Sequence, residues 1–306
     1  MTKANAPQRD TTVIGELANP AFVRLPDPLD LFATRAARFR FLAGHSDLKS
    51  YLEFLAGLCE VQHQVQGGLP AVTPPDGALL KRARDFGMPP LGRDPFEMDL
   101  VFAATLEALL RMMARIPMPD AAAEALSRLQ DHPDAVRSDM ARAVLADSTP
   151  AEALPEHIYV AAALQIHFAR LAAGLDAKAV VPVGDGACPV CGSPPASSMV
   201  VGWQGAHGTR YCACALCGTL WNYVRVKCTL CASTEGIAYQ EIEGSGGVAK
   251  AETCNSCHRY VKILHQHIDP AVEVIADDVA SLGLDLLVRE TTEFRRGGVN
   301  PFLLGY

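Results

Sequence analysis

The 306-residue sequence lacks a long hydrophobic run and an excess of basic residues. No uninterrupted apolar stretch approaches the roughly 18–20 residues of a membrane-spanning helix, so we expect no membrane insertion. The N-terminal segment MTKANAPQRD has no apolar core behind a charged start, which is unlike a secretory signal and favours a cytoplasmic protein. With 34 acidic against 27 basic residues the net charge is −7, which disfavours binding to nucleic acid through its phosphates.

The common signatures of catalysis are also missing. We find no convincing Ser–His–Asp set, phosphate-binding glycine loop or pair of carboxylates, so we expect no enzyme. Gly244, Gly246 and Gly247 are typical of a hairpin turn, because no helix follows them. Hydrophobic residues make up 49% and charged residues 20% of the chain, which excludes wholesale disorder, and the length suggests two domains or one domain with a smaller attachment.

Strand-type alternation is absent from residues 30–175, where apolar residues recur at helical spacing. Leu48, Leu52, Leu55 and Cys59 mark one such helical face, and Asp47 precedes it as a candidate N-cap. The predicted helices cover about 28–66, 76–87, 95–115, 120–130, 133–147 and 154–174. We therefore predict an irregular lead-in over 1–29 and an all-helical domain over 30–177.

Nine of the ten cysteines lie within seventy residues of one another. Eight of them form four CxxC pairs, which are Cys188–Cys191, Cys214–Cys217, Cys228–Cys231 and Cys254–Cys257. Adding 40 to each of the first four numbers gives the second four, so the cysteine framework is an internal repeat. The repeat predicts tandem modules over 188–227 and 228–267.

A CxxC pair lets two thiolates bind one ion from a single tight turn, and a second pair completes a tetrahedron of sulfur. Four thiolates select zinc or a single iron, and in a reducing compartment clustered cysteines bind metal more often than they form disulfides. We expect each module to hold one ion with its own four cysteines, although an interleaved arrangement remains open. Because sulfur fills every position, a structural ion is favoured over a catalytic one.

Short β-type runs separate the cysteine pairs, and a helix follows them. The predicted strands cover 198–203, 220–227, 237–243 and 260–267, and the predicted helix covers about 277–289, with Asp277 and Asp278 as its caps. We assign 268–306 to this helix and to an apolar docking tail, NPFLLGY. The fold class is thus α+β, with a helical N-terminal domain, two tandem rubredoxin-like or zinc-ribbon β modules and a C-terminal helix.

Several residues near the repeat have more than one interpretation. Cys212 is a buried thiol on a strand, or else a spare ligand or reactive thiol, whereas Cys59 belongs to a helical core face. His258, His265 and His267 are not needed as ligands beside four sulfurs, and we expect the last two to be solvated on a strand. Glycine follows Cys191 and Cys217, as in rubredoxin and zinc-ribbon knuckles, but Ala232 and His258 take that place in the second module.

The sequence resembles the FdhE-type formate dehydrogenase accessory proteins. The resemblance is carried by the four CxxC pairs and by the segments TLWNYVRVKC (219–228), YVKILHQHIDP (260–270), ADDVASLGLDLL (276–287) and NPFLL (300–304). It implies a cytoplasmic protein that contacts the catalytic subunit of a molybdenum- or tungsten-dependent formate dehydrogenase during maturation or quality control before export. It also implies two iron ions, one for each four-cysteine site, with zinc as the alternative.

Two other functions stay open at this point. An iron–thiolate site could serve a rubredoxin-like redox protein that delivers electrons during enzyme maturation. A nucleic-acid-binding zinc ribbon is disfavoured, since residues 188–270 hold six basic against five acidic side chains. For a partner surface, Trp203, Trp221 and Tyr223 are candidates if the core does not use them. The oligomeric state is left open.

Overall fold

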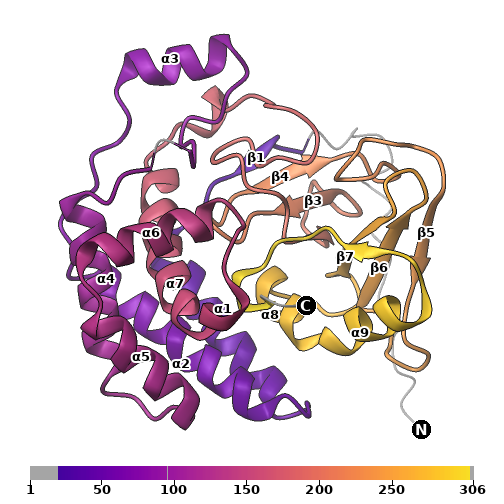
Figure 1. The fold of residues 1–306 in the computed structure, drawn as a ribbon. Helices are drawn as coiled ribbons and strands as arrows, with labels where there is room; N and C mark the ends of the chain where they lie inside the picture. Colours follow the sequence, from indigo (N-terminus) through magenta and orange to yellow (C-terminus); the bar gives the residue numbers. More distant parts are fainter. Residues whose placement is uncertain (1–19, 95, 304–306) are drawn as a thin grey trace, which may run out of the picture.

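The structure, a computed structural model, describes residues 20–94 and 96–303. Helices form its N-terminal part, and strands with two groups of cysteines form its C-terminal part, which confirms the predicted α+β class (Figure 1). Residues 1–19 of the predicted lead-in and 304–306 of the predicted tail lie outside the described residues. Within the lead-in, Val23–Arg24 forms strand β1.

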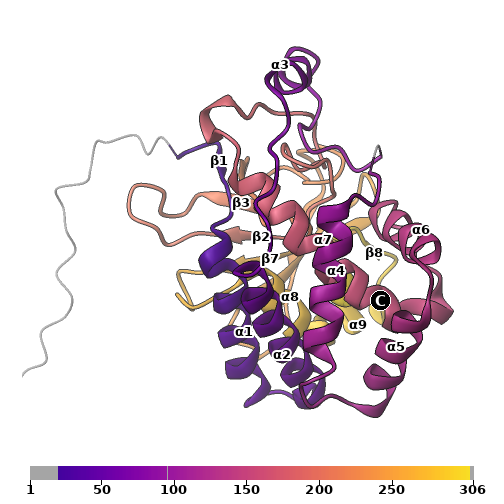
Figure 2. The same ribbon diagram turned by 90° about the vertical axis from the view of Figure 1, so that its left-hand side faces the viewer.

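The helical part contains seven α-helices among the described residues. They are α1 (Pro28–Ala43), α2 (Lys49–Gln66), α3 (Gly77–Asp85), α4 (Leu100–Met113), α5 (Asp120–Asp131), α6 (Asp134–Leu145) and α7 (Leu154–Ala173). Helix α7 is buried along almost its whole length, and Figure 2 shows it among the other helices, in front of the sheet. Helix α3 stands away from the rest at the top of both views.

Two helix starts differ from the prediction. Helix α4 begins only at Leu100, because the Asp99 side chain accepts a hydrogen bond from the backbone N–H of Phe102 and so caps the helix there. Asp47 is not an N-cap, because α2 starts after Leu48 and this cap makes no side-chain hydrogen bond to the helix. The backbone N–H of Leu48 is instead bound by the Ser46 hydroxyl, and this turn separates α1 from α2.

The strands of both cysteine modules form a single sheet. They are β2 (Ser197–Val200), β3 (Arg210–Ala213), β4 (Leu220–Tyr223), β5 (Ile237–Gln240), β6 (Ala249–Cys254), β7 (Arg259–His265) and β8 (Arg295–Arg296). The order across the sheet is β1-β4-β3-β2-β7-β6-β5, with β8 beside β7. Within each module the strands are antiparallel, whereas β2 and β7 join the modules in parallel, with Ser198 opposite Ile263.

The sequence predicted four of these strands near their observed positions, and it gave β3 only as the strand on which one interpretation places Cys212. It missed β6 and β8. It also predicted one helix over 277–289, where the structure has α8 (Val274–Ala280) and α9 (Leu282–Thr291). Asp277 and Asp278 do not cap this segment as predicted. The N-cap is Glu273, whose carboxylate accepts the backbone N–H groups of Ile275 and Ala276.

One hydrophobic core extends from the helices into the first module, but not to the second group of cysteines. Cys188, Cys191, Cys214 and Cys217 belong to the same buried cluster as the inner residues of α1, α2, α4 and α7. Ion pairs also join the helical part to the C-terminal segment, since Arg35 and Arg38 of α1 bind Glu273 and Asp277 at the start of α8. The helical part therefore supports the first module directly.

Candidate metal centre

All four CxxC pairs form the same backbone turn. In each, the carbonyl oxygen of the first cysteine accepts the N–H of the residue four positions later, at 2.9–3.1 Å. That later residue has a left-handed φ in every case: 78° at Gly192, 73° at Gly218, 63° at Ala232 and 52° at His258. We call this CxxC turn a knuckle. The second module forms it without glycine, although the left-handed conformation costs other L-residues about 1–2 kcal/mol.

The turns bring the sulfur atoms together in two quartets of consecutive cysteines, each with its ligand atoms within 4.8 Å of one another. In the first quartet, Sγ–Sγ distances are 3.6 Å for Cys188–Cys217 and 3.4 Å for Cys191–Cys214. In the second they are 3.8 Å for Cys228–Cys257 and 3.7 Å for Cys231–Cys254. Four sulfurs bound to zinc at about 2.3 Å lie roughly 3.8 Å apart, so both quartets fit a tetrahedral ion.

Local hydrogen-bond donors can offset the negative charge of bound thiolates. The backbone N–H of Cys217 points at Cys214 Sγ and that of Leu230 at Cys228 Sγ, both at 3.4 Å. Hydroxyls add to this in the first quartet, where Thr219 Oγ1 lies 3.2 Å from Cys217 Sγ and Ser193 Oγ lies 3.4 Å from Cys191 Sγ. Such outer contacts orient the ligands and tune the affinity of a metal site.

Three thiols of the first quartet, those of Cys188, Cys191 and Cys217, have shifted pKa values. Burial works against ionisation of Cys191, but hydrogen bonds from Cys188, Cys214 and Cys217 hold its pKa well below normal. Burial raises the pKa of Cys188 and of Cys217 well above normal. A bound cation would therefore displace thiol protons, as expected for thiolate sites.

The two remaining cysteines lie outside both quartets. Cys212 is buried in β3, opposite Ser198 and Trp221, and burial raises its pKa to about 12. Cys59 is buried in α2, where burial likewise raises its pKa to about 12. Both are protonated thiols in the core at neutral pH, which is the first of the two interpretations of Cys212.

Neither quartet includes a histidine. His258 is exposed at its knuckle, with Nδ1 3.5 Å from Glu293 Oε1. His265 and His267 face each other with ring centroids 5.2 Å apart, but only His267 is exposed as predicted. Both ring nitrogens of His265 are buried without a hydrogen-bond partner, and burial lowers its pKa to about 4.

A buried network of charges lies beyond what the sequence predicted. Lys262 of β7 pairs with Asp278 and Asp285, and Arg296 of β8 pairs with the same two carboxylates. Burial opposes ionisation of Asp278, but the charges of Arg296 and Lys262 lower its pKa. The network fixes α8, α9 and the C-terminal segment on the sheet. The sequence contains one signal of this network, the adjacent Asp277 and Asp278 within an otherwise apolar segment.

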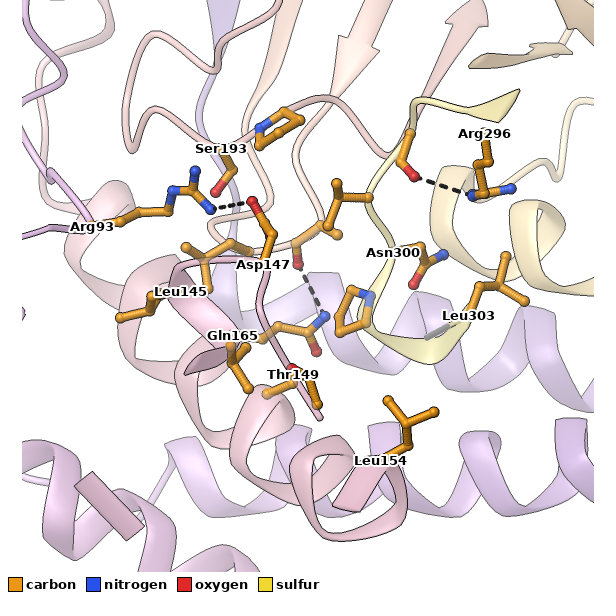
Figure 3. Close-up of a pocket in the computed structure, with 18 residues that line it drawn as sticks. Arg93, Leu145, Asp147, Thr149, Leu154, Gln165, Ser193, Arg296, Asn300 and Leu303 are labelled. Carbon is orange, nitrogen blue, oxygen red and sulfur yellow. Dashed lines mark hydrogen bonds and ion pairs between the residues drawn. The ribbon is translucent and has the colours of Figure 1, made fainter. Parts of the chain in front are cut away.

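A cavity of about 280 Å³ lies next to the first quartet (Figure 3). Ala215 and Leu216, the two residues between Cys214 and Cys217, form part of its wall together with Ser193 and Pro194, and the helical part and the C-terminal segment form the rest. Its polar groups pair with protein groups: Arg93 with Asp147 at 2.9 Å, and Gln165 Nε2 with the carbonyl of Ala215 at 3.0 Å.

The aromatic residues considered for a partner surface are largely used within the fold. Trp221 is buried in the core. Trp203 is partly buried, with the Arg24 guanidinium 4.0 Å from its ring centroid, and the Tyr223 hydroxyl donates to Asp185 and to the carbonyl of Cys228. Among the described residues, no helix combines the length and apolar character needed to cross a membrane.

Comparison with known proteins finds relatives along nearly the whole chain. Three family models match it: "FdhE, N-terminal" over residues 20–185, "FdhE, central domain" over 187–225 and "FdhE, C-terminal domain" over 226–303. A protein FdhE homolog of Rhizobium meliloti is 44% identical over 301 residues, which are 98% of each chain. Another from Pseudomonas aeruginosa is 37% identical over 278 residues, 87% of this chain and 88% of the homolog.

A solved structure supports the same family relationship. The crystal structure of the FdhE protein from Pseudomonas aeruginosa matches with a TM-score of 0.82 at 34% sequence identity, and the match covers 94% of this chain and 99% of that one. The similarity therefore includes the helical part as well as both cysteine modules.

Proposed function

Because the chain belongs to the FdhE family, we propose that it is an accessory protein required for formate dehydrogenase activity. It acts in the cytoplasm and binds the catalytic subunit of the molybdenum or tungsten enzyme during maturation or quality control, before export. The observation that carries the proposal is the pair of sulfur quartets on a framework that matches the family over its full described length.

Each quartet holds one ion, iron or zinc. Cys188, Cys191, Cys214 and Cys217 bind the first, and Cys228, Cys231, Cys254 and Cys257 bind the second. A bound ion supplies a cross-link that a module of this size cannot obtain from its own apolar core. The knuckle turns hold the sulfurs at tetrahedral spacing, and their backbone N–H groups offset the thiolate charge.

The protein acts by binding, without catalytic turnover of its own. With four sulfurs on each ion no coordination position is left for a substrate, in contrast to catalytic zinc sites that keep one open. The first quartet is also enclosed by the core, which suits a structural role. The sheet, cross-linked by the two bound ions, and the helical part together would present the surface that recognises the immature enzyme.

Affinity capture tests this function. A tagged catalytic subunit, expressed in cells with this protein and trapped before export, should retain the wild-type chain. Cys188→Ser should weaken capture because it removes a ligand of the first ion, whereas Cys212→Ser, which changes a buried cysteine outside the quartets, should not. Failure of the wild-type chain to bind the subunit in any maturation state would contradict the proposal.

A rubredoxin-like redox role is the second candidate. It is favoured by the glycine knuckles of the first quartet, where Gly192 and Gly218 adopt positive φ next to buried sulfurs. Iron bound there could pass single electrons. Protein purified in air should then absorb visible light and bleach on reduction, whereas a colourless zinc-loaded native protein would rule this role out.

A further inference from the structure

The two quartets differ sharply in exposure. In the first, no cysteine is more than 2% exposed, whereas in the second Cys231 is exposed and Cys257 is partly exposed. We propose that the second quartet is a ligand-exchange site, where a thiol from outside the chain replaces Cys231 on the bound ion. This inference rests on the proposed metal binding and assigns a different task to each ion.

The helical part covers the knuckles of the first quartet. A Cβ at Gly192 would lie 3.2 Å from Pro89 Cγ, and one at Gly218 would lie 2.8 Å from Leu31 Cδ2. The backbone N–H of Leu91 also donates to the carbonyl of Val190, between the first two ligands, at 2.9 Å. An incoming ligand could reach these sulfurs only after the helical part had moved away.

Among the described residues, the second quartet is covered on one side only, where Thr229 is buried and Leu230 lies against Gly186 and Gly297. Its cysteines are absent from the main core cluster, and beyond Cys231 the residues 232–236 are small or polar and partly or fully open to solvent. Asn255 and Ser256 are exposed, and the Ser256 hydroxyl donates to Ser233 Oγ at 2.8 Å, which links the two knuckles at the surface. A thiol can therefore approach Cys231 without a change of fold.

Cys231 is the ligand best placed to leave. Cys228 and Cys254 are 4% and 1% exposed and belong to the buried side of the quartet, so they would keep hold of the ion together with Cys257. In the exchange, the bond from the ion to Cys231 Sγ breaks and a bond to the incoming sulfur forms. The proton of the incoming thiol passes to the released Cys231 sulfur, and no electron is transferred. Sulfur is the donor that suits an ion already held by thiolates.

Chemical rescue tests the exchange directly. Cys231→Ser and Cys191→Ser remove equivalent ligands of the two quartets, since the positions differ by the 40-residue repeat. Each variant is loaded with cobalt(II), whose visible spectrum distinguishes four sulfur ligands from three. The intact quartet of each variant contributes its own four-sulfur spectrum, so the readout is the four-sulfur absorbance for each chain. Reduced glutathione should raise this absorbance from one site to two in Cys231→Ser but not in Cys191→Ser, and S-methylglutathione should raise it in neither. Absence of rescue in Cys231→Ser, or equal rescue in both variants, would overturn the inference.

The source of the thiol is tested in the same assay. Rescue by glutathione alone supports exchange with small thiols. Rescue also by the formate dehydrogenase catalytic subunit with free cysteines, and not by the same subunit after alkylation, supports exchange with a protein thiol.

A second measurement uses the unmodified chain and does not depend on the folding of any variant. With two zinc ions bound, a chromophoric chelator should remove one ion at least about tenfold faster than the other, because release from the buried quartet needs local opening and each tenfold corresponds to about 1.4 kcal/mol. Excess glutathione should accelerate the fast phase alone. Release of both ions at one rate would contradict the exchange while leaving metal binding intact, whereas a chain that binds no metal would contradict the proposed function itself.

Discussion

Arg210 of β3 and Glu252 of β6 form an ion pair across two intervening strands, with Arg210 Nη2 2.8 Å from Glu252 Oε1. Their side chains are 0% and 2% exposed. The guanidinium also donates to Ser198 Oγ of β2 at 3.0–3.1 Å. The pair therefore connects the first cysteine module to the second inside the shared sheet, and it fixes how the two quartets are held relative to each other.

Removal of one partner of the Arg210–Glu252 pair should destabilise the folded protein. Glu252→Ala leaves the Arg210 charge buried and unpaired, for which we expect a loss of about 3–5 kcal/mol in the free energy of unfolding. Replacing both residues, as Arg210→Met with Glu252→Leu, should recover most of that loss because no buried charge remains. Urea unfolding of the metal-loaded variants measures both changes. A single variant as stable as the wild type would contradict this role of the pair.

The non-glycine knuckles carry backbone strain that a substitution can remove. Ala232→Gly relieves a φ of 63° and should strengthen the second module by about 1 kcal/mol. Gly218→Ala is the opposite change in the first module, where it creates a left-handed alanine whose Cβ lies 2.8 Å from Leu31 Cδ2.

Denaturant unfolding of the metal-loaded chain compares these two variants. We expect Ala232→Gly to unfold at higher denaturant and Gly218→Ala at lower denaturant than the wild type. A stabilising effect of Gly218→Ala would show that the first knuckle is not constrained as described.

His265 should make the stability depend on pH. Burial, assisted by the charges of His267, Lys250 and Arg225, lowers its pKa to about 4, although Glu241 acts in the opposite direction. A lowered histidine pKa means that the unfolded chain binds the proton more readily than the folded one. Stability is then complete above the unfolded pKa of about 6.5 and falls as the pH drops toward 4.

Thermal unfolding at pH 7 and pH 5 measures this contribution. His265→Gln should lose less in Tm between the two pH values than the wild type, because the substituted side chain does not titrate. His207→Gln, which changes an exposed loop histidine, should keep the wild-type dependence. An identical pH dependence in His265→Gln and the wild type would contradict the assignment.

The sequence predicted the sulfur quartets well because their geometry is local. A CxxC turn places two sulfurs by its own backbone, so the repeat needed to bring only two turns together in each module. The parallel pairing of β2 with β7 was beyond such reasoning, since Ser198 and Ile263 are far apart in the chain and no turn sets their register.

The buried charges were missed for a related reason. Lys262 lies in a β-type run and Asp278 in an apolar helical one, and each residue alone resembles a surface position. Their partnership depends on tertiary packing that places both at 0% exposure. Asp277 and Asp278 were predicted as helix caps by a local sequence rule. Their actual roles are set by ion pairs with Arg38 and Lys262, which are distant in the sequence.

The central claim is that the chain binds two metal ions through eight thiolates. It is tested most directly by elemental analysis of protein purified without added metal, with the free thiols counted in the same sample. We predict about two ions of iron or zinc for each wild-type chain. Each of the single variants Cys188→Ser and Cys228→Ser should hold about one ion for each chain, since each substitution removes one ligand from one quartet. A natively purified chain without bound metal, with all the quartet cysteines reduced and free to react, would contradict the account.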